Sequence, residues 1–275
     1  MVTFKFIQEF LEFYFILLQR NEKMAAVDDS FWNVHDAYRN RDNYREVFAS
    51  TLNRIGSEVD LASVKSCLTL GPGEGLFEIG FIQKCAANVG KLTAVEQDNK
   101  STERLKSHLQ KSLPNVEAQV IEADFCIWKG LDNPVDLVLM FHMLYYCRPD
   151  ERKEFLRKVH DNWLAADGFA VVVSASRTRS PGNANEVYER LGTPLVMWED
   201  IEADFLEVGF IKEHLYEMQF ARDFSNPDES FLRFYQSRVD QPVTLSDVRD
   251  VIKELYPDGK SYHGFNTLAV FRRTY

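Results

Sequence analysis

The chain has 275 residues, of which 45% are hydrophobic, enough for one large core or for one core with a small appended subdomain. Its net charge is −10 and its sequence pI is about 5.2, and no basic run is longer than Arg272-Arg273. These values favour a globular protein and disfavour nucleic acid as a partner, because a phosphate backbone would find no electrostatic support.

The cysteines and the apolar segments indicate the compartment. Cys67, Cys85, Cys126 and Cys147 stand at no metal-type spacing, and no signal peptide ends in a small-residue cleavage site. The most apolar stretch, residues 4–18, is interrupted by charged side chains, so it is not expected to span a bilayer. We therefore expect a cytoplasmic protein with reduced thiols and no metal site.

The N-terminal region carries two segments of helical pattern. Residues 1–23 place apolar side chains on a broad helical face, which predicts an accessory helix outside the main domain, with docking on a membrane surface as the alternative. Met24 is a second plausible start, so the main domain is expected over residues 24–275. Aromatic side chains at helical intervals over residues 28–50 can roof a binding site, although packing on the core is the simpler explanation.

A glycine-rich turn follows the first predicted strand. The apolar run 64–70 leads directly into Gly71, Gly73 and Gly75 and then into a predicted helix over residues 76–87. Glycines permit positive φ and the close approach of a ligand, and a helix N-terminus offers unpaired N–H groups to a carboxylate or phosphate. The turn is therefore predicted to bind a ligand; the alternative is a turn that only ends a strand.

The next predicted strand, residues 91–96, ends in Glu96, where a doubly wound sheet places an acid for the hydroxyls of a ribose. A dinucleotide fingerprint would require glycine where Leu76 stands, and no Tyr-x-x-x-Lys pair follows the fifth strand, so a nicotinamide oxidoreductase is disfavoured. The observed Gly-x-Gly-x-Gly with an acidic strand end resembles the cofactor site of class I methyltransferases. That resemblance implies S-adenosylmethionine as the cofactor.

Strands and helices continue to alternate along the chain. The patterns predict a helix over 101–111, strands over 117–121 and 135–141, a helix over 150–165 and a strand over 169–174. This alternation predicts an α/β fold with a doubly wound, mostly parallel sheet, whose ligands bind at the carboxyl ends of the strands. Asp124 and Phe125 follow one such end and suit an adenine; the alternative for Asp124 is the N-cap of a short turn.

The pattern changes after residue 180. It predicts helices over 184–191, from 199 or 200 to Gly209, over 228–239 and over 245–255, with strands near 210–216 and over 262–272. The helices between the last strands indicate an insertion, over about residues 180–260, that covers the active site.

Two short segments carry a more specific resemblance. Met143-Leu144-Tyr145-Tyr146 after the strand 135–141, and Phe265-Asn266-Thr267-Leu268 in the last strand, make the chain similar to the histamine N-methyltransferase family from Val34 onward. The resemblance implies a Rossmann-like methyltransferase fold with a seven-stranded sheet and a small helical subdomain over the substrate. It also implies a monomeric, cytosolic enzyme that methylates an imidazole nitrogen of a small amine.

Carried over by position, the resemblance assigns individual residues. The cofactor contacts are Gly71, Gly73, Gly75, Glu96, Asp124, Phe125 and Phe141. Tyr145, Tyr146, Phe234 and Asn266 match the family on the substrate side, and the family's two pocket tryptophans fall near Asn183 and Tyr188. His142 stands where the family has a glutamine, and Asp42 approximates the family's substrate-pairing glutamate.

The predicted function is S-adenosylmethionine-dependent N-methylation of a small amine or imidazole compound. A sulfonium methyl is already activated, so the enzyme mainly aligns a neutral nitrogen and excludes water. His142 or Asp42 is expected to take the proton of an aliphatic amine, and Asn266 to hydrogen-bond the substrate. A protonated His142 would repel a cationic amine as the pH falls through about 6 to 7, unless it is a buried structural histidine. The alternative function is an inactive protein that retains S-adenosylmethionine binding.

Overall fold

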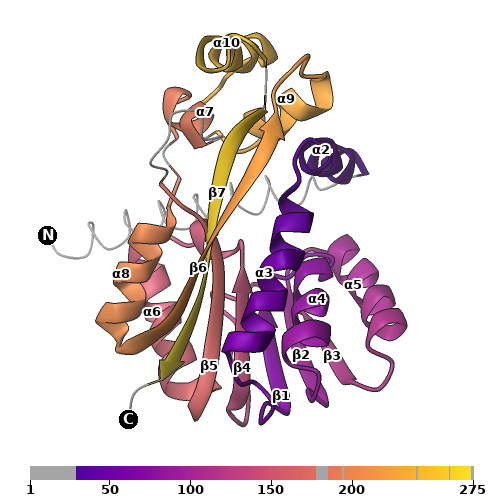
Figure 1. Cartoon of the computed structure of the whole chain (residues 1–275), viewed down its shortest axis with the longest axis vertical. Helices are drawn as coiled ribbons and strands as arrows, with labels where there is room; N and C mark the ends of the chain where they lie inside the picture. The colour runs from indigo at the N-terminus through magenta and orange to yellow at the C-terminus, as the bar shows by residue number, and fades with distance from the viewer. Residues whose placement is uncertain (1–28, 178–184, 194, 240, 260, 274–275) are drawn as a thin grey trace, which may run out of the picture.

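The computed structural model describes residues 29–177, 185–193, 195–239, 241–259 and 261–273. A seven-stranded sheet forms its centre, in the order β3-β2-β1-β4-β5-β7-β6 (Figure 1). The strands are β1 (Ser66–Leu70), β2 (Lys91–Glu96), β3 (Glu117–Glu122), β4 (Val135–Phe141), β5 (Leu164–Ala175), β6 (Phe210–Asp223) and β7 (Ser261–Arg273). The first five run parallel, and β7 is antiparallel to both of its neighbours. The predicted doubly wound, mostly parallel sheet is therefore confirmed.

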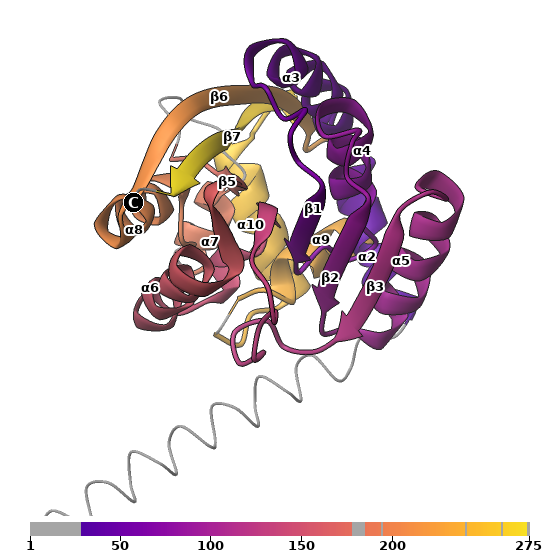
Figure 2. The same cartoon turned by 90° about the horizontal axis from the view of Figure 1, so that it is seen from below.

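Helices cover both faces of this sheet (Figure 2). One face carries α3 (Tyr44–Glu58), α4 (Leu76–Cys85) and α5 (Asn99–Ser112), and the other carries α6 (Pro149–Lys158) and α8 (Trp198–Val208). The central strands are buried on both sides, so Cys67 packs into one hydrophobic cluster and Leu68 into the other. This two-sided burial explains why β1 and β4 read as continuous apolar runs.

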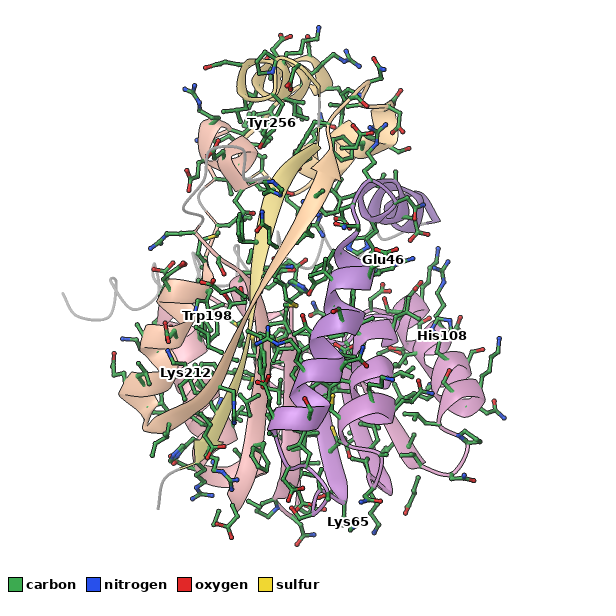
Figure 3. All side chains as sticks on the ribbon, in the orientation of Figure 1. Glu46, Lys65, His108, Trp198, Lys212 and Tyr256 are labelled. Atoms are coloured by element: carbon green, nitrogen blue, oxygen red, sulfur yellow. The ribbon has the colours of Figure 1, made fainter. Side chains whose placement is uncertain are left out.

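A helical cap lies beyond one end of the sheet. It consists of α2 (Asp29–Arg39), α7 (Asn185–Arg190), α9 (Glu229–Gln236) and α10 (Leu245–Leu255), which share a third hydrophobic cluster. The long strands β6 and β7 extend from the sheet into this cap (Figure 1). Lys65, just before β1, lies at the opposite end of the molecule from Tyr256 of the cap (Figure 3), so the carboxyl ends of the parallel strands point toward the cap.

Several boundaries differ from the predictions. Strand β6 continues to Asp223 instead of ending near 216, because Tyr216, Met218 and Phe220 keep the period-two burial of a strand. The helix predicted over 150–165 ends in a π-helical turn, Val159–Trp163, and β5 begins at Leu164. The predicted helix over residues 1–23 lies outside the described residues.

The described part of the chain contains no helix that is long and apolar enough to cross a membrane. It also contains no group of three or more His, Cys, Asp or Glu side chains arranged to hold a metal ion. All four cysteines are free thiols.

Candidate functional site

The glycine turn between β1 and α4 has the left-handed backbone that the sequence predicted. The φ angles of Gly71, Gly73 and Gly75 are +60°, +58° and +77°. A Cβ on Gly71 would meet the Cβ of Met143 at 3.0 Å, and one on Gly75 would collide with Leu105, whereas one on Gly73 would have nothing within 4 Å. Gly71 and Gly75 are thus required for packing, and Gly73 is the glycine with an open side on which a ligand fits.

Glu96 links this turn to the end of β2. Its side chain is buried, and its two oxygens accept hydrogen bonds from the backbone N–H groups of Gly73 (2.8 Å) and Asp98 (2.9 Å). Burial raises the pKa of the carboxyl, and these N–H groups oppose the rise. A carboxylate offers about four lone-pair sites, so these two bonds and a third, from the backbone N–H of Gln97, still leave acceptor capacity beside the open face of Gly73.

Three residues predicted near an adenine have other contacts. Asp124 Oδ1 accepts the N–H of Cys126 at 2.8 Å, so this carboxylate caps the following turn, as the alternative interpretation held. Phe125 is buried against Phe155, with ring centroids 5.7 Å apart.

Phe141 is also buried, 5.9 Å from the ring of Phe48 and 5.8 Å from that of Phe81. It shares one hydrophobic cluster with Leu137 and Leu139, because alternate residues of β4 face the same side of the sheet. Both rings belong to the core, and their contacts with an adenine stay a prediction.

A polar cluster lies at the carboxyl end of β4. The hydroxyl of Tyr44 is 2.9 Å from His142 Nε2, and the side chain of Asn266 forms a second hydrogen bond to Tyr44. His142 has a φ of +54°, an uncommon conformation for a side-chain-bearing residue, and its backbone N–H donates to Val173 of β5 at 2.9 Å. The three side chains come from α3, β7 and the residue after β4, so the cluster joins both halves of the fold.

The electrostatics of His142 overturn its expected titration. Burial, and then the nearby Arg39 and Arg222, lower its pKa from 6.5 to about 3. The imidazole is therefore neutral throughout the range from pH 5 to 8. The prediction that His142 becomes a cation between about pH 6 and 7 is wrong for this structure.

Asp42 does not have the free carboxylate that the sequence suggested. Arg222 of β6 binds Asp42 Oδ2 through both Nε (3.1 Å) and Nη2, and the N–H of Tyr44 donates to Oδ1 at 3.1 Å. Both side chains of this ion pair are at most 6% exposed. The ion pair with Arg222 neutralises the charge of Asp42, which argues against its predicted roles as proton acceptor and amine partner.

The side chains predicted for the substrate gather around Arg238, just after α9. The guanidinium carbon of Arg238 lies 3.7 Å above the centre of the Phe234 ring, and the side chain hydrogen-bonds to both Tyr146 and Tyr188. Tyr145 completes the group, with its ring 4.6 Å from that of Tyr146. The structure brings these four predicted residues together, whereas Asn183 lies outside the described residues.

Residues 67–168 match the family whose description is methyltransferase domain. This match spans less than half of the chain, so it shows the likeness of that segment to methyltransferase domains. The matched segment runs from β1 into β5 and includes the glycine turn, Glu96 and His142, but neither Tyr44 nor Asn266. The match therefore supports the predicted S-adenosylmethionine cofactor and does not extend to the acceptor side.

Several solved structures share the fold of this chain. A candidate methyltransferase from Bacillus halodurans C-125 has a TM-score of 0.62 at 15% identity, covering 82% of this chain and 100% of that one. The N-methyltransferase NodS from Bradyrhizobium japonicum WM9, in complex with S-adenosylhomocysteine, has a TM-score of 0.53 at 14% identity, covering 90% and 99%. The YcgJ protein of Bacillus subtilis has a TM-score of 0.56 at 12% identity, covering 82% and 99%. No curated protein sequence is significantly similar to the chain.

Three residues of the candidate site are not evident from the sequence. Tyr44 was noted only as one aromatic residue in a helical pattern, although it holds His142. Arg39 and Arg238 were not singled out, because isolated arginines among 32 basic residues carry no motif. Only the packing of α2 and α9 against the sheet end reveals them.

Proposed function

We propose that the chain is an S-adenosylmethionine-dependent N-methyltransferase that acts on a small amine or imidazole compound. The observation that carries this proposal is the position of Glu96. Its carboxylate is held beside the open face of Gly73, at the same end of the sheet as the Tyr44–His142–Asn266 cluster.

The residues present fit the cofactor. Gly73 has room for a ligand where a side chain would otherwise stand, and Glu96 has acceptor capacity for the two hydroxyls of a ribose. The N-terminus of α4, which starts at Leu76, offers N–H groups to the carboxylate of the amino acid part. Asp124, whose Oδ1 caps a turn, retains Oδ2 as an acceptor for an adenine amine.

The acceptor side favours a nitrogen that is neutral before it reacts. S-adenosylmethionine supplies an activated methyl group on a sulfonium centre. With a pKa of about 3, His142 is a weak base, and Asp42 is bound to Arg222, so neither readily removes a proton from a cationic amine. A free imidazole, with a reference pKa of about 6.5, is mostly neutral at pH 7 and needs no such help. These groups therefore support an imidazole acceptor over an aliphatic ammonium.

In this proposal the Tyr44–His142–Asn266 cluster positions the acceptor. Neutral His142 has one donor and one acceptor nitrogen, and Tyr44, itself hydrogen-bonded to Asn266, fixes the orientation of its ring. The helical cap over this end of the sheet excludes water from the reacting nitrogen.

Mass analysis of a library of small amines and imidazoles tests the proposal. The library is incubated with S-adenosylmethionine and either the wild-type protein or Glu96→Ala, and S-adenosylhomocysteine binding is titrated calorimetrically in parallel. The proposal predicts that a member gains one methyl group, with an equal amount of S-adenosylhomocysteine formed, and that Glu96→Ala reduces both. Tight cofactor binding without any methylated product would instead favour the inactive binding protein, and absence of binding would exclude both.

A further inference from the structure

We propose that the methyl acceptor carries a carboxylate and that Arg238 binds it. This inference rests on the proposed function and specifies its substrate class. It replaces the cationic amine suggested by the family resemblance with an anionic or zwitterionic nitrogen compound.

Among the described residues, Arg238 contacts one aromatic ring and two tyrosine hydroxyls. Its guanidinium stacks on Phe234 and hydrogen-bonds to the hydroxyls of Tyr146 and Tyr188. Its Nη1 is buried and has no hydrogen-bond partner among the described residues. A buried donor without an acceptor is costly, and the cost is largest for a charged group. Within the described part of the chain, Nη1 of Arg238 therefore lacks an acceptor.

The two arginines that are buried among the described residues have carboxylate partners, whereas Arg238 is half-buried. Arg152 pairs with Asp204, and Arg222 pairs with Asp42. None of the ion pairs between described residues includes Arg238. Burial opposes its charge, but the surrounding tyrosine oxygens raise its pKa, so Arg238 remains a cation. A ligand carboxylate would supply the anion that a buried arginine has elsewhere in this fold.

A continuous aromatic stack holds this guanidinium in place. Tyr38 stacks on Phe234 with centroids 3.5 Å apart and planes 11° apart, and Arg222 lies 3.9 Å from the centre of Tyr38 on the other side. Arg222 and Arg238 therefore stand at opposite ends of a two-ring stack, one neutralised by Asp42 and the other not. The stack thus connects Arg238 through Phe234 to Tyr38 of α2 and Arg222 of β6, and these contacts hold the guanidinium without a ligand.

Arg238 is connected to the proposed methylation site by neighbouring rings. The ring centroid of Tyr145 lies 6.4 Å from that of His142 and 4.6 Å from that of Tyr146, whose hydroxyl is hydrogen-bonded to Arg238. Arg39 is a second positive charge in this region, because it lowers the pKa of His142 and interacts electrostatically with Tyr145. A cationic amine would meet repulsion here, whereas a carboxylate would meet attraction.

Matched acceptors that differ in charge test this inference. Imidazolepropionate and histamine both carry an imidazole on a short chain, ending in a carboxylate and in an amine, respectively. Calorimetry measures the binding of each to the protein saturated with S-adenosylhomocysteine, and steady-state methyl transfer gives KM and kcat. The variants are Arg238→Gln, Arg238→Lys and the control Arg233→Gln, whose guanidinium is exposed on α9, the helix that precedes Arg238, and is paired with Glu229.

The wild-type protein is expected to bind imidazolepropionate at least about tenfold more tightly than histamine. Arg238→Gln should remove this preference and raise KM for imidazolepropionate about tenfold or more, with a smaller change in kcat. Arg238→Lys should retain part of the preference. The control Arg233→Gln should retain all of it. A preference for histamine, equal weakening of both compounds by Arg238→Gln, or binding of neither compound would overturn the inference.

The two proposals fail differently. If S-adenosylhomocysteine binds and the carboxylate preference appears by calorimetry but no methyl group moves, the N-methyltransferase proposal fails and the assignment of Arg238 stands. If histamine is methylated and imidazolepropionate is not, the function stands and the assignment of Arg238 fails. If Arg238→Gln fails to fold, the affinities of the wild-type protein for the two compounds still test whether a carboxylate is preferred.

Discussion

Replacement of Glu96 by alanine is the most informative single substitution on the cofactor side. The buried carboxylate accepts the N–H groups of Gly73 and Asp98 and, in our proposal, two ribose hydroxyls. A hydrogen bond to a charged group contributes about 1.5–3 kcal/mol net, and water replaces part of what the ribose loses. We therefore expect Glu96→Ala to weaken S-adenosylmethionine binding by about 1.5–3 kcal/mol, which corresponds to roughly 10- to 150-fold in Kd.

The same substitution has a cost for the protein without ligand. The N–H groups of Gly73 and Asp98 lose their acceptor in a site where Glu96 is only 7% exposed. Each unsatisfied buried donor costs about 1–3 kcal/mol, although partial entry of water reduces this. Thermal unfolding should therefore detect a lower melting temperature for Glu96→Ala, and binding must be measured well below it.

Calorimetric titration with S-adenosylhomocysteine is the assay, and Glu122→Ala is the matched control. Glu122 pairs with Glu96 in the register of β2 and β3, but it is exposed and contacts Asn99 instead of the glycine turn. The control should bind the cofactor like the wild type. If Glu96→Ala folds and binds with unchanged affinity, Glu96 is not at the ribose and the reasoning from the strand end is wrong.

Three further predictions address the acceptor cluster, the glycine turn and a buried acid. Tyr44→Phe removes the hydrogen bond to His142 and should lower kcat/KM about 5- to 30-fold while cofactor affinity changes little; equal activity would make the bond structural only. Gly73→Ala should abolish most cofactor binding, whereas Gly259→Ala, with the same φ of +58° in a remote turn, should lose only stability, about 1–2 kcal/mol; similar cofactor affinities would contradict the open-face argument. Burial raises the pKa of Glu78 from 4.5 to about 8, so the unfolded chain releases its proton first and stability falls as the pH rises from 4.5 to 8. Glu78→Gln should flatten that fall, by on the order of 4 kcal/mol, in denaturant unfolding at pH 5 and pH 8; parallel curves for both proteins would refute it.

The fold was predictable because its signals are local. Strand β4 and helix α10 begin and end where the sequence predicted, since each is a periodic or continuous apolar segment between clear breakers. The long β6 was underestimated because its outer half alternates polar and buried residues and extends away from the main sheet into the cap.

The glycine turn could be predicted from the sequence in the same way, because a strand, three glycines and a helix follow one another in the chain. The acceptor side could not be predicted, because its contacts join distant segments. Tyr44 and His142 are 98 positions apart in the sequence, and Asp42 and Arg222 are 180 positions apart. No spacing rule foretells that Arg222 neutralises Asp42. The burial that lowers the pKa of His142 likewise depends on the cap and not on neighbouring residues.

The central claim is that the glycine turn, Glu96 and the Tyr44–His142–Asn266 cluster form one methyl-transfer site. A crystal structure with S-adenosylhomocysteine bound tests it most directly. The account predicts ribose hydroxyls within hydrogen-bonding distance of Glu96, the amino acid part against the open face of Gly73, and the sulfur facing His142. A ligand bound elsewhere, or one whose sulfur points away from His142, would contradict it.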